Sequence, residues 1–421
     1  MASQKYKQYS VLFASTLAFT ICFMIWMMFA VIGIPIQQKL GLNATEFGML
    51  AATPVLSGSL MRVPLGIWTD RFGGRIVFFA LMLACVIPVF ALQFATEFWQ
   101  FLAIGLVIGL AGGSFSVGTP YVARWFRKEQ QGLAMGIFGA GNAGAALTKL
   151  LAPVIIVAAG WQMVPTVYAA ILLGTALLFW VMTYSDPSHI VSSKVTLGEQ
   201  LALMKNPKVL LYSQLYSVVF GGYVALALWM TRYYVGEYHF DLKHAAFLAA
   251  AFSLPGGVLR ALGGWFSDKF GAHKVTEVVL WVMMLVFFIL SYPQTDFVIQ
   301  TTKGATAYHL GITHEWFTIL LFFVGVAMAV GKASVFKYVA DDFPGNIGAV
   351  SGIVGLAGGM GGFLLPIMFG ALLDMTGVRS TAFMLLFGCA LVGAVWLNFA
   401  ERKHHYGEKD DAARKAVAAQ A

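Results

Sequence analysis

The sequence predicts an all-α membrane protein of twelve transmembrane helices, arranged as two pseudo-symmetric halves of six helices. Hydrophobic residues make up 59% of the 421 residues and charged residues only 11%, whereas soluble domains carry about 25% charged residues to solvate their surface. Twelve apolar stretches are long enough to span a bilayer, which takes about 20 residues, and the second stretch of each half carries a shared motif. This composition argues against a soluble enzyme, a disordered chain and a secreted disulfide scaffold.

The twelve stretches are expected to be helices, because the strands of a membrane barrel would be about ten residues long and alternate in polarity. Glycine and proline recur inside the stretches, which membrane helices tolerate where neighbouring helices cover the backbone. The predicted spans are 10–36, 46–69, 75–95, 98–123, 131–158, 163–184, 209–235, 244–267, 274–292, 315–340, 346–373 and 380–399.

Basic residues between the spans indicate the orientation. With the amino terminus inside, 17 lysines and arginines fall in cytoplasmic segments and 5 in outer segments, as the positive-inside rule expects. We therefore expect a multi-pass membrane protein with both termini in the cytoplasm. The net charge of +8 reflects these loops, and no basic stripe for nucleic acid is present. The other 5 of the 27 basic residues lie within spans: Arg62, Lys149, Arg260, Lys332 and Lys337.

The longest polar connection, residues 185–208, is expected to be a cytoplasmic linker between the halves 1–184 and 209–400, with a cytoplasmic tail at 401–421. The halves are related in sequence. RVPLGIWTDRFGGRIV, beginning at Arg62, aligns with RALGGWFSDKFGAHKV, beginning at Arg260, and six of sixteen positions are identical at an offset of 198 residues. Repeated halves with a site at their interface are typical of secondary transporters.

Arg62 and Arg260 are the strongest functional feature of the sequence. An arginine inside a membrane costs at least about 2.5–3.5 kcal/mol on the insertion scale, so both should face the bundle interior. No Asp or Glu occurs in the middle of any predicted span, which favours an anion site over a buried ion pair. A guanidinium matches planar oxyanions through two parallel hydrogen bonds. Nitrate, nitrite or a small carboxylate would suit the pair.

Glycine-rich segments occur in corresponding helices of the two halves. GIFGAGNAGAALTKL begins at Gly136 in the fifth span, and GIVGLAGGMGGFLLP begins at Gly352 in the eleventh. Small residues at such spacings allow close helix packing, and packing alone is the alternative interpretation. Asn142 lies within the first segment, where its amide needs a partner and suits an oxyanion. Lys149 follows seven residues later on the same helix face.

The aromatic residues and two loops give weaker predictions. Tyr216 and Phe220 share one helix face at a spacing of four, although packing explains such a pattern equally well. The loops Gly66–Gly73 and Gly264–Gly271 repeat a G-x-x-x-D-[RK]-x-G pattern, which we interpret as conformational hinges. Asp70 and Asp268 would then form gating contacts with basic residues or helix ends.

Together these features resemble the major facilitator superfamily, through the twelve helices in related halves and the GIWTDRFGGR loop. Within it, GAGNAG, GLAGGMGG and the arginines in SLMRVP and GVLRALGG resemble the nitrate/nitrite porter family. The resemblance covers nearly the whole chain. It implies that Arg62 and Arg260 clamp nitrate and that Asn142 hydrogen-bonds it.

The same resemblance assigns aromatic and glycine residues. Tyr216 and Phe220 match the aromatic pair of the family's seventh helix, and Phe29 and Phe115 match the residues that sandwich the flat anion, with Phe23 and Phe138 as alternatives to these two. Seven glycines would let the fifth and eleventh helices slide past their neighbours: Gly139, Gly141, Gly144, Gly355, Gly358, Gly359 and Gly361.

The predicted function is therefore nitrate transport, with nitrite as a possible substrate, by alternating access. Proton symport is favoured over nitrate/nitrite antiport, because the segment before the eleventh-helix glycines is short and Lys149, Lys332 and Lys337 offer candidate proton carriers. A small-carboxylate exchanger and an anion sensor are the alternatives. We expect a monomer in the lipid bilayer, with no cofactor, no metal and no enzymatic activity.

Overall fold

The computed structural model describes residues 4–185, 202–343 and 347–418. Most of the predicted linker 185–208 and the last three residues of the predicted tail 401–421 therefore lie outside the described residues. Ten helical segments in the described part are long and apolar enough to cross a membrane, and two bent helix pairs bring the number to twelve. The prediction of twelve spans in two halves is confirmed.

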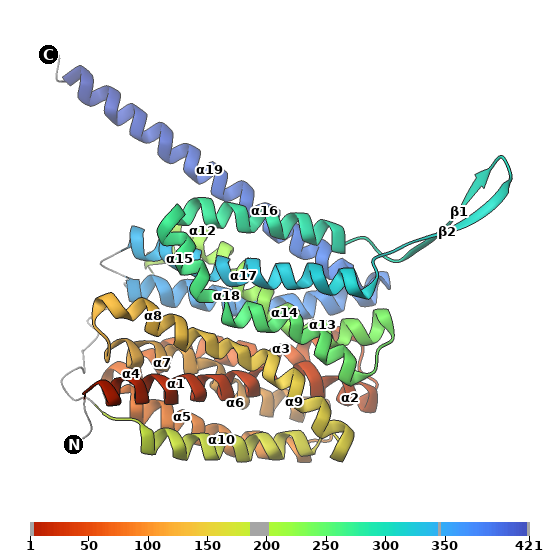
Figure 1. The fold of residues 1–421 in the computed structure, drawn as a ribbon, viewed down its shortest axis with the longest axis horizontal. Coiled ribbons are helices and arrows are strands. Elements are labelled where there is room, and N and C mark those ends of the chain that lie inside the picture. The colour runs from red at the N-terminus through yellow and green to blue at the C-terminus, as the bar shows by residue number, and fades with distance from the viewer. Residues whose placement is uncertain (1–3, 186–201, 344–346, 419–421) are drawn as a thin grey trace.

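The first six spans occupy one side of the molecule (Figure 1). Several of them are built from more than one helix. In chain order, the elements are α1 (Gln4–Trp26), α2 (Phe29–Leu40), α3 (Ala44–Leu60), α4 (Arg62–Phe72), α5 (Gly74–Ala91), η1 (Leu92–Phe94), α6 (Phe98–Ile108), η2 (Gly109–Gly113), α7 (Ser114–Ala123), α8 (Lys128–Gly139), η3 (Ala140–Ala143), α9 (Gly144–Ala159) and α10 (Met163–Met182).

The last six spans form the other side, with a two-stranded hairpin between two of them. In chain order, the elements are α12 (Pro207–Tyr216), η5 (Ser217–Gly221), α13 (Gly222–Tyr238), α14 (Leu242–Val258), α15 (Arg260–Phe270), α16 (Ala272–Leu290), β1 (Thr295–Thr301), β2 (Gly304–Leu310), α17 (His314–Asp342), α18 (Ile347–Thr376) and α19 (Thr381–Ala418). The α19 helix continues through most of the predicted tail.

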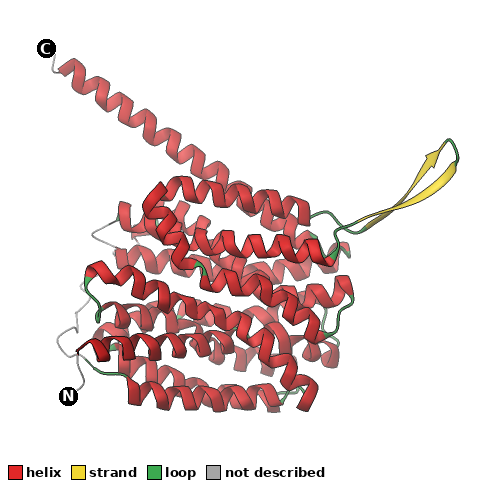
Figure 2. Ribbon diagram, in the orientation of Figure 1, coloured by secondary structure: helices red, strands yellow, loops and turns green. Residues whose placement is uncertain are grey.

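The helices run roughly along one common direction, so the bundle has two ends (Figure 1). The amino terminus and the far end of α19 lie at one, which we call the termini end. The hairpin β1–β2 projects from the other, which we call the hairpin end (Figure 2). The predicted spans left residues 293–314 there without assigned structure. A two-residue turn and Gly304, at φ +113°, join strands that pair from Thr295↔Leu310 to Thr301↔Gly304.

The second and eighth spans bend immediately before the two arginines. The α3/α4 pair bends by 41° and the α14/α15 pair by 47°. Pro64 has no N–H to donate to the carbonyl of Leu60, so the helix breaks at Met61. In the eighth span, Pro255 is followed by two glycines, and a proline or a small-residue pair is a common cause of a kink. Arg62 and Arg260 each become the first residue of the helix after the bend.

Hydrogen bonds join the two halves at the hairpin end. The carboxylate of Asp374, in α18, accepts from the backbone N of Ala44 at 3.0 Å, the backbone N of Thr45 at 2.8 Å and the Thr45 hydroxyl at 2.6 Å. This carboxylate thus lies at the amino-terminal end of α3, where the helix dipole favours negative charge. Arg232 Nε also donates to Gln37 Oε1 at 3.0 Å. These bonds hold the halves together at this end.

Candidate functional site

A small pocket lies between the two halves, midway along the bundle, where helices from both halves contribute side chains. It contains two guanidinium groups, one amide, one phenol hydroxyl and several aromatic rings, and none of the described residues that line it is a carboxylate. The lining residues are Phe19, Phe23, Arg62, Gly112, Phe115, Asn142, Tyr216, Phe220 and Arg260.

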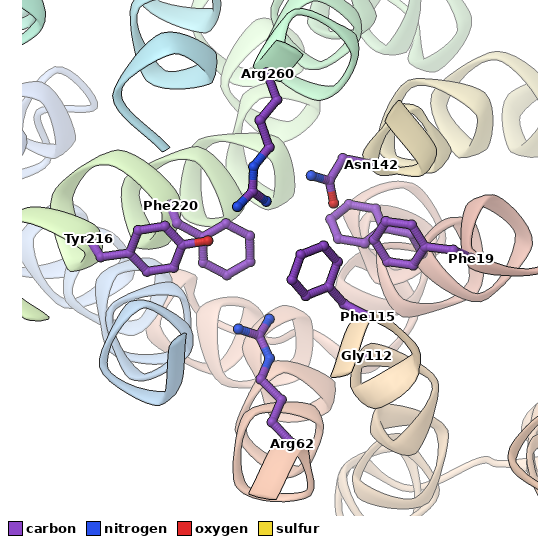
Figure 3. A pocket seen from close by; sticks show the side chains of 9 residues that line it. Phe19, Arg62, Gly112, Phe115, Asn142, Tyr216, Phe220 and Arg260 are labelled. Carbon is purple, nitrogen blue, oxygen red and sulfur yellow. The ribbon is translucent and has the colours of Figure 1, made fainter. Parts of the chain in front are cut away.

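Arg62 and Arg260 extend toward each other from opposite sides of this pocket (Figure 3). Arg62 is 8% exposed, and its Nη1 donates a hydrogen bond of 2.9 Å to the carbonyl of Gly355 in the other half. Its guanidinium carbon lies 5.0 Å from the centre of the Phe220 ring. The guanidinium of Arg260 lies 5.3 Å from the ring centres of both Phe115 and Phe336. Aromatic faces therefore offset part of the desolvation of both cations.

Two buried donors at the pocket lack partners. Asn142 is 2% exposed, and its Nδ2 has no hydrogen-bond partner among the described residues. Arg62 Nε is also buried and has no hydrogen-bond partner within the described part of the chain. Burying a polar group without a partner costs roughly 1–3 kcal/mol. Two such donors beside two positive charges make the pocket suited to an anion that accepts several hydrogen bonds.

Breaks in regular α-helix position most of these side chains. Gly112 lies in the 3-10 segment η2 and Asn142 in the 3-10 segment η3. Phe220 lies in η5, a π-helical turn, one turn after Tyr216. Such interruptions inside helices are frequent at functional sites. Because Arg62 and Arg260 also follow bends, five spans depart from straight helix geometry at the level of the pocket.

The pocket contains most of the predicted aromatic residues but not Phe29. The Tyr216 and Phe220 rings stack with their centroids 5.1 Å apart, and Phe115 also lines the pocket. Phe29 is buried, but it is not among the lining residues. It lies six residues beyond Phe23, roughly 9 Å farther along the span at 1.5 Å per residue.

Phe19 and Phe23 of α1 occupy the place predicted for Phe29. The two are spaced four residues apart on one helix face, a pattern visible in the sequence. The ring of Phe138 does not line the pocket, but it stacks behind it on Phe19 at 4.9 Å and on Phe115 at 5.9 Å. The aromatic wall therefore has two layers on the side of the first half.

The predicted glycines lie at close contacts around the pocket. A β-carbon at Gly141 would overlap the Phe19 ring, and one at Gly358 would overlap the Tyr216 ring. At Gly359 it would meet Ser59 of the other half. Gly139 faces the Arg260 side chain, Gly355 faces Arg62, Gly144 lies against the backbone of α1, and Gly361 lies against Ser217.

The two predicted gating carboxylates pair with basic residues of their own half. Asp70 forms an ion pair with Arg124, at the end of α7. The Asp268 carboxylate lies 3.6 Å from Lys337 Nζ in α17. Neither of these described pairs connects the two halves, whereas Asp374 at the hairpin end does. This state therefore does not show the predicted closure of the termini end by Asp70.

The three lysines predicted as proton carriers have different surroundings. The Nζ of Lys337 lies within 2.9 Å of Asp341 as well as 3.6 Å from Asp268, and its side chain is 35% exposed. The two acidic partners were not predicted: Asp341 lies at the end of the same helix, α17, and Asp268 lies in α15. Lys149 and Lys332 are buried, at 1% and 0% exposure, and neither lines the pocket.

Sequence comparisons place the chain among known transporters. Residues 14–302 match the profile of the Major Facilitator Superfamily. The chain is 36% identical to a probable nitrate/nitrite antiporter, NarK1, of Thermus thermophilus, over 93% of this chain and 91% of that protein. It is 29% identical to a nitrite extrusion protein of Bacillus subtilis (strain 168), over 96% and 98%. It is 31% identical to a probable nitrate transporter, NarT, of Staphylococcus haemolyticus, over 88% and 91%.

Solved structures support the fold. A bacterial homologue of the human lysosomal transporter Spinster, in an inward-facing and occupied conformation, superposes with a TM-score of 0.72 at 16% identity, over 95% of this chain and 98% of that one. The nucleoside transporter NupG gives a TM-score of 0.70 at 14% identity, over 92% and 98%. At these identities the likeness concerns the architecture alone.

Proposed function

The chain belongs to the nitrate/nitrite porters of the Major Facilitator Superfamily, and we propose that Arg62 and Arg260 hold the nitrate or nitrite anion that it transports. The observation that supports this most strongly is the pair of facing guanidinium groups in a pocket whose described lining includes no carboxylate. A fixed double positive charge attracts an anion at any pH the cell meets, because arginine stays protonated.

The remaining pocket groups fit a flat oxyanion. Each arginine fork can donate two parallel hydrogen bonds to a pair of oxygens in one plane. The unpartnered Nδ2 of Asn142 supplies a further donor, and the Tyr216 hydroxyl points into the same space (Figure 3). Phe115 and Phe220 present rings beside the two forks. Nitrate, which has three oxygens in one plane, can use all of these contacts.

We assign alternating access to the two halves, with the anion bound at their interface. An empty pocket keeps two unneutralised guanidinium groups facing each other, which hinders closure of the halves. A bound anion neutralises part of that repulsion, so the loaded carrier closes more readily. The predicted glycines would act in this movement by allowing neighbouring helices to slide at close range. Counterflow tests the electrostatic part: equal reorientation rates of empty and loaded carriers would contradict it.

The hairpin end is assigned to the outer face and the termini end to the cytoplasm of a bacterial inner membrane. The distribution of basic residues along the sequence supports this orientation. With this assignment, the bonds of Asp374 and Arg232 close the carrier on its outer side. Labelling of an introduced Lys303→Cys, at the hairpin turn, by a membrane-impermeant thiol reagent on intact cells checks the orientation.

A small-carboxylate exchanger is the main alternative, because formate could also bind between two arginines. Formate has only two oxygens and would leave donors of the pocket unpartnered, which carries a free-energy cost. We therefore expect nitrate to be preferred. Inhibition of labelled nitrate uptake by unlabelled formate and by unlabelled nitrate discriminates the two functions. If formate inhibited as strongly as nitrate, the result would favour a carboxylate exchanger.

The decisive experiment compares nitrate uptake by the wild type with Arg62→Lys and Arg260→Lys in proteoliposomes. Lysine keeps the positive charge but loses the planar fork. Since hydrogen bonds to a charged group contribute about 1.5–3 kcal/mol, each variant should lose about tenfold or more in nitrate affinity. Arg75→Lys is the matched control, because Arg75 bonds the carbonyl of Trp180 within the first half and does not line the pocket. Near-normal affinity in both pocket variants would refute the clamp.

A further inference from the structure

Lys149 differs from the other two predicted proton carriers because its hydrogen bond crosses between the halves. Its Nζ, from α9, donates to the Ser253 hydroxyl of α14 at 2.7 Å. Lys332 instead donates to the carbonyl of Gly256 at 2.6 Å and lies 3.7 Å from the centre of the Tyr223 ring, all within the second half. Lys337 is paired with carboxylates. Only Lys149 among these three sits at the interface that opens and closes during transport.

The surroundings of Lys149 contain neutral groups and one further base. Besides Ser253, its Nζ donates to the carbonyl of Ala145 at 3.2 Å. The neighbouring titratable groups are Tyr168 of α10, which bonds Thr148 beside Lys149, and Tyr223 of α13, which bonds the carbonyl of Ser253. Lys332 of α17 lies over the Tyr223 ring. None of the ion pairs found among the described residues involves Lys149, and charged side chains of α14 lie at its exposed start, at Lys243 and His244. A charged ammonium in such a place lacks a counter-ion and is costly to bury.

A chain of polar contacts links Lys149 to the anion pocket. The Tyr223 hydroxyl donates to the carbonyl of Ser253 at 2.9 Å and lies 3.5 Å from the carbonyl oxygen of Asn142. Asn142 in turn lines the pocket. Along the fifth span, Lys149 follows Asn142 by seven residues, roughly 10 Å at 1.5 Å per residue. A negative charge in the pocket therefore acts on Lys149 through an interior of low polarity, where charge interactions are strong.

We propose that Lys149 is the proton-coupling residue of the carrier. This proposal rests on the proposed nitrate transport. In the empty carrier the side chain is an uncharged amine that bonds Ser253. When nitrate enters between Arg62 and Arg260, the amine lone pair takes one proton from the outer solution and becomes an ammonium. The added charges, one negative and one positive, then cancel. On the inner side nitrate leaves the pocket, so the Lys149 ammonium loses its counter-charge. It then releases its proton to the inner solution and becomes an amine again.

The position at the interface gives the proton access to both sides in turn. Lys149 lies on the hairpin side of the pocket, because α9 runs from Asn142 toward that end (Figure 1). Separation of α9 from α14 breaks the Lys149–Ser253 bond and exposes the amine to the outer solution. A lysine bonded only within one half, such as Lys332, would not be uncovered by the same movement. The transported stoichiometry expected is one proton per nitrate.

The test separates coupled uptake from exchange in proteoliposomes. One assay records nitrate uptake driven by an alkaline interior together with nitrate-dependent proton entry, reported by an entrapped pH-sensitive dye. A second records nitrate counterflow at equal pH on both sides, which needs no net proton movement. For Lys149→Gln, which keeps a donor toward Ser253, we expect coupled uptake and proton entry to fall by about tenfold or more while counterflow changes by about twofold at most.

Lys332→Gln is the matched control, because it removes the other buried lysine without touching a bond between the halves. It should retain proton entry with nitrate. Persistence of proton entry in Lys149→Gln, or its loss in Lys332→Gln alone, would overturn the proposal, as would net nitrate uptake by the wild type into nitrate-free vesicles without proton entry. Absence of nitrate counterflow in the wild type would instead count against the proposed function itself.

A second variant keeps the test valid if Lys149→Gln fails to fold. Ser253→Ala removes the partner of the amine across the interface and leaves Lys149 titratable. Proton entry should continue, but the outer pH at which nitrate uptake is half-maximal should shift. An unchanged pH profile in a folded Ser253→Ala protein would contradict the role of this bond.

Discussion

The Nη1 atom of Arg62 donates a 2.9 Å hydrogen bond to the carbonyl oxygen of Gly355. Arg62 belongs to the first half and Gly355 to the second, so one of the two proposed substrate groups also joins the halves. At the corresponding glycine of the first half, Gly139, a β-carbon would lie 3.6 Å from the Cδ atom of Arg260, and no such bond is found between these two residues among the described contacts. The two arginines therefore play unequal parts in this state.

Gly355→Ala should weaken nitrate binding. A β-carbon there would lie 3.4 Å from Arg62 Nη1, so the guanidinium must shift by a few tenths of an ångström. A displaced fork loses part of its hydrogen-bond geometry, and we expect the nitrate KM to rise by about threefold to tenfold. Gly352→Ala is the control, because a β-carbon there meets nothing within 4 Å. Equal KM values for both variants would show that the position of Arg62 is not critical.

Asn142→Asp should abolish nitrate uptake while preserving the shape of the side chain. The substitution adds a negative charge beside Arg62 and Arg260, and this internal carboxylate competes with the anion. Asn142→Ala removes the donor without adding charge and should cost about 1–2 kcal/mol, about tenfold in affinity. Nitrate uptake across a concentration series measures both. Comparable activity of Asn142→Asp and Asn142→Ala would place this amide outside the substrate's reach.

Asp374→Asn should favour opening at the hairpin end. The amide keeps one acceptor oxygen but loses the charge that interacts with the amino-terminal end of α3, an effect of about 0.3–1 kcal/mol or more. Spin labels at Gln38→Cys and Lys243→Cys report the separation of the halves there, in a background without the three native cysteines. We expect a larger population of long distances than in the wild type.

The control for this substitution is Glu46→Gln. Glu46 is also a carboxylate at the start of α3, but it accepts from the backbone of Asn43 within its own half. It should leave the distance distribution unchanged. The assignment of Asp374 as an outer closure would be wrong if both variants gave the wild-type distribution.

The sequence predicted the spans because apolar length alone determines what can lie in a bilayer. It also predicted Arg62 and Arg260 as pocket residues, since two embedded charges in a repeated motif are not explained by ion pairing when no acidic residue lies in the middle of a predicted span. Asn142 was predicted from its amide within an apolar, glycine-rich segment. Tyr216, Phe220 and Phe115 were assigned to the site through the family resemblance, because packing and binding residues follow the same helical spacing.

The errors have physical causes. Phe29 was chosen, with Phe23 as an alternative and Phe19 not considered, because the sequence does not indicate how deep in the bundle the pocket lies. The acidic partners of Lys337 were not predicted, because Asp341 lies at a helix end, which the sequence shows only to within about a turn, and Asp268 belongs to another helix, α15. The interface bond from Lys149 to Ser253 joins residues 104 positions apart, and hydropathy contains no information about such pairs.

The bends before Arg62 and Arg260 have a mechanical consequence. Each arginine lies in the first turn of a short helix, Arg62 in α4 and Arg260 in α15. Because of the bend, this short helix can tilt independently of the longer helix before it. While α3 stays fixed by its bonds to Asp374, a tilt of α4 alone would swing the Arg62 fork. The hydrogen bonds from Arg62 to the anion would then change before any large movement of the halves, so that a local movement of α4 releases the anion.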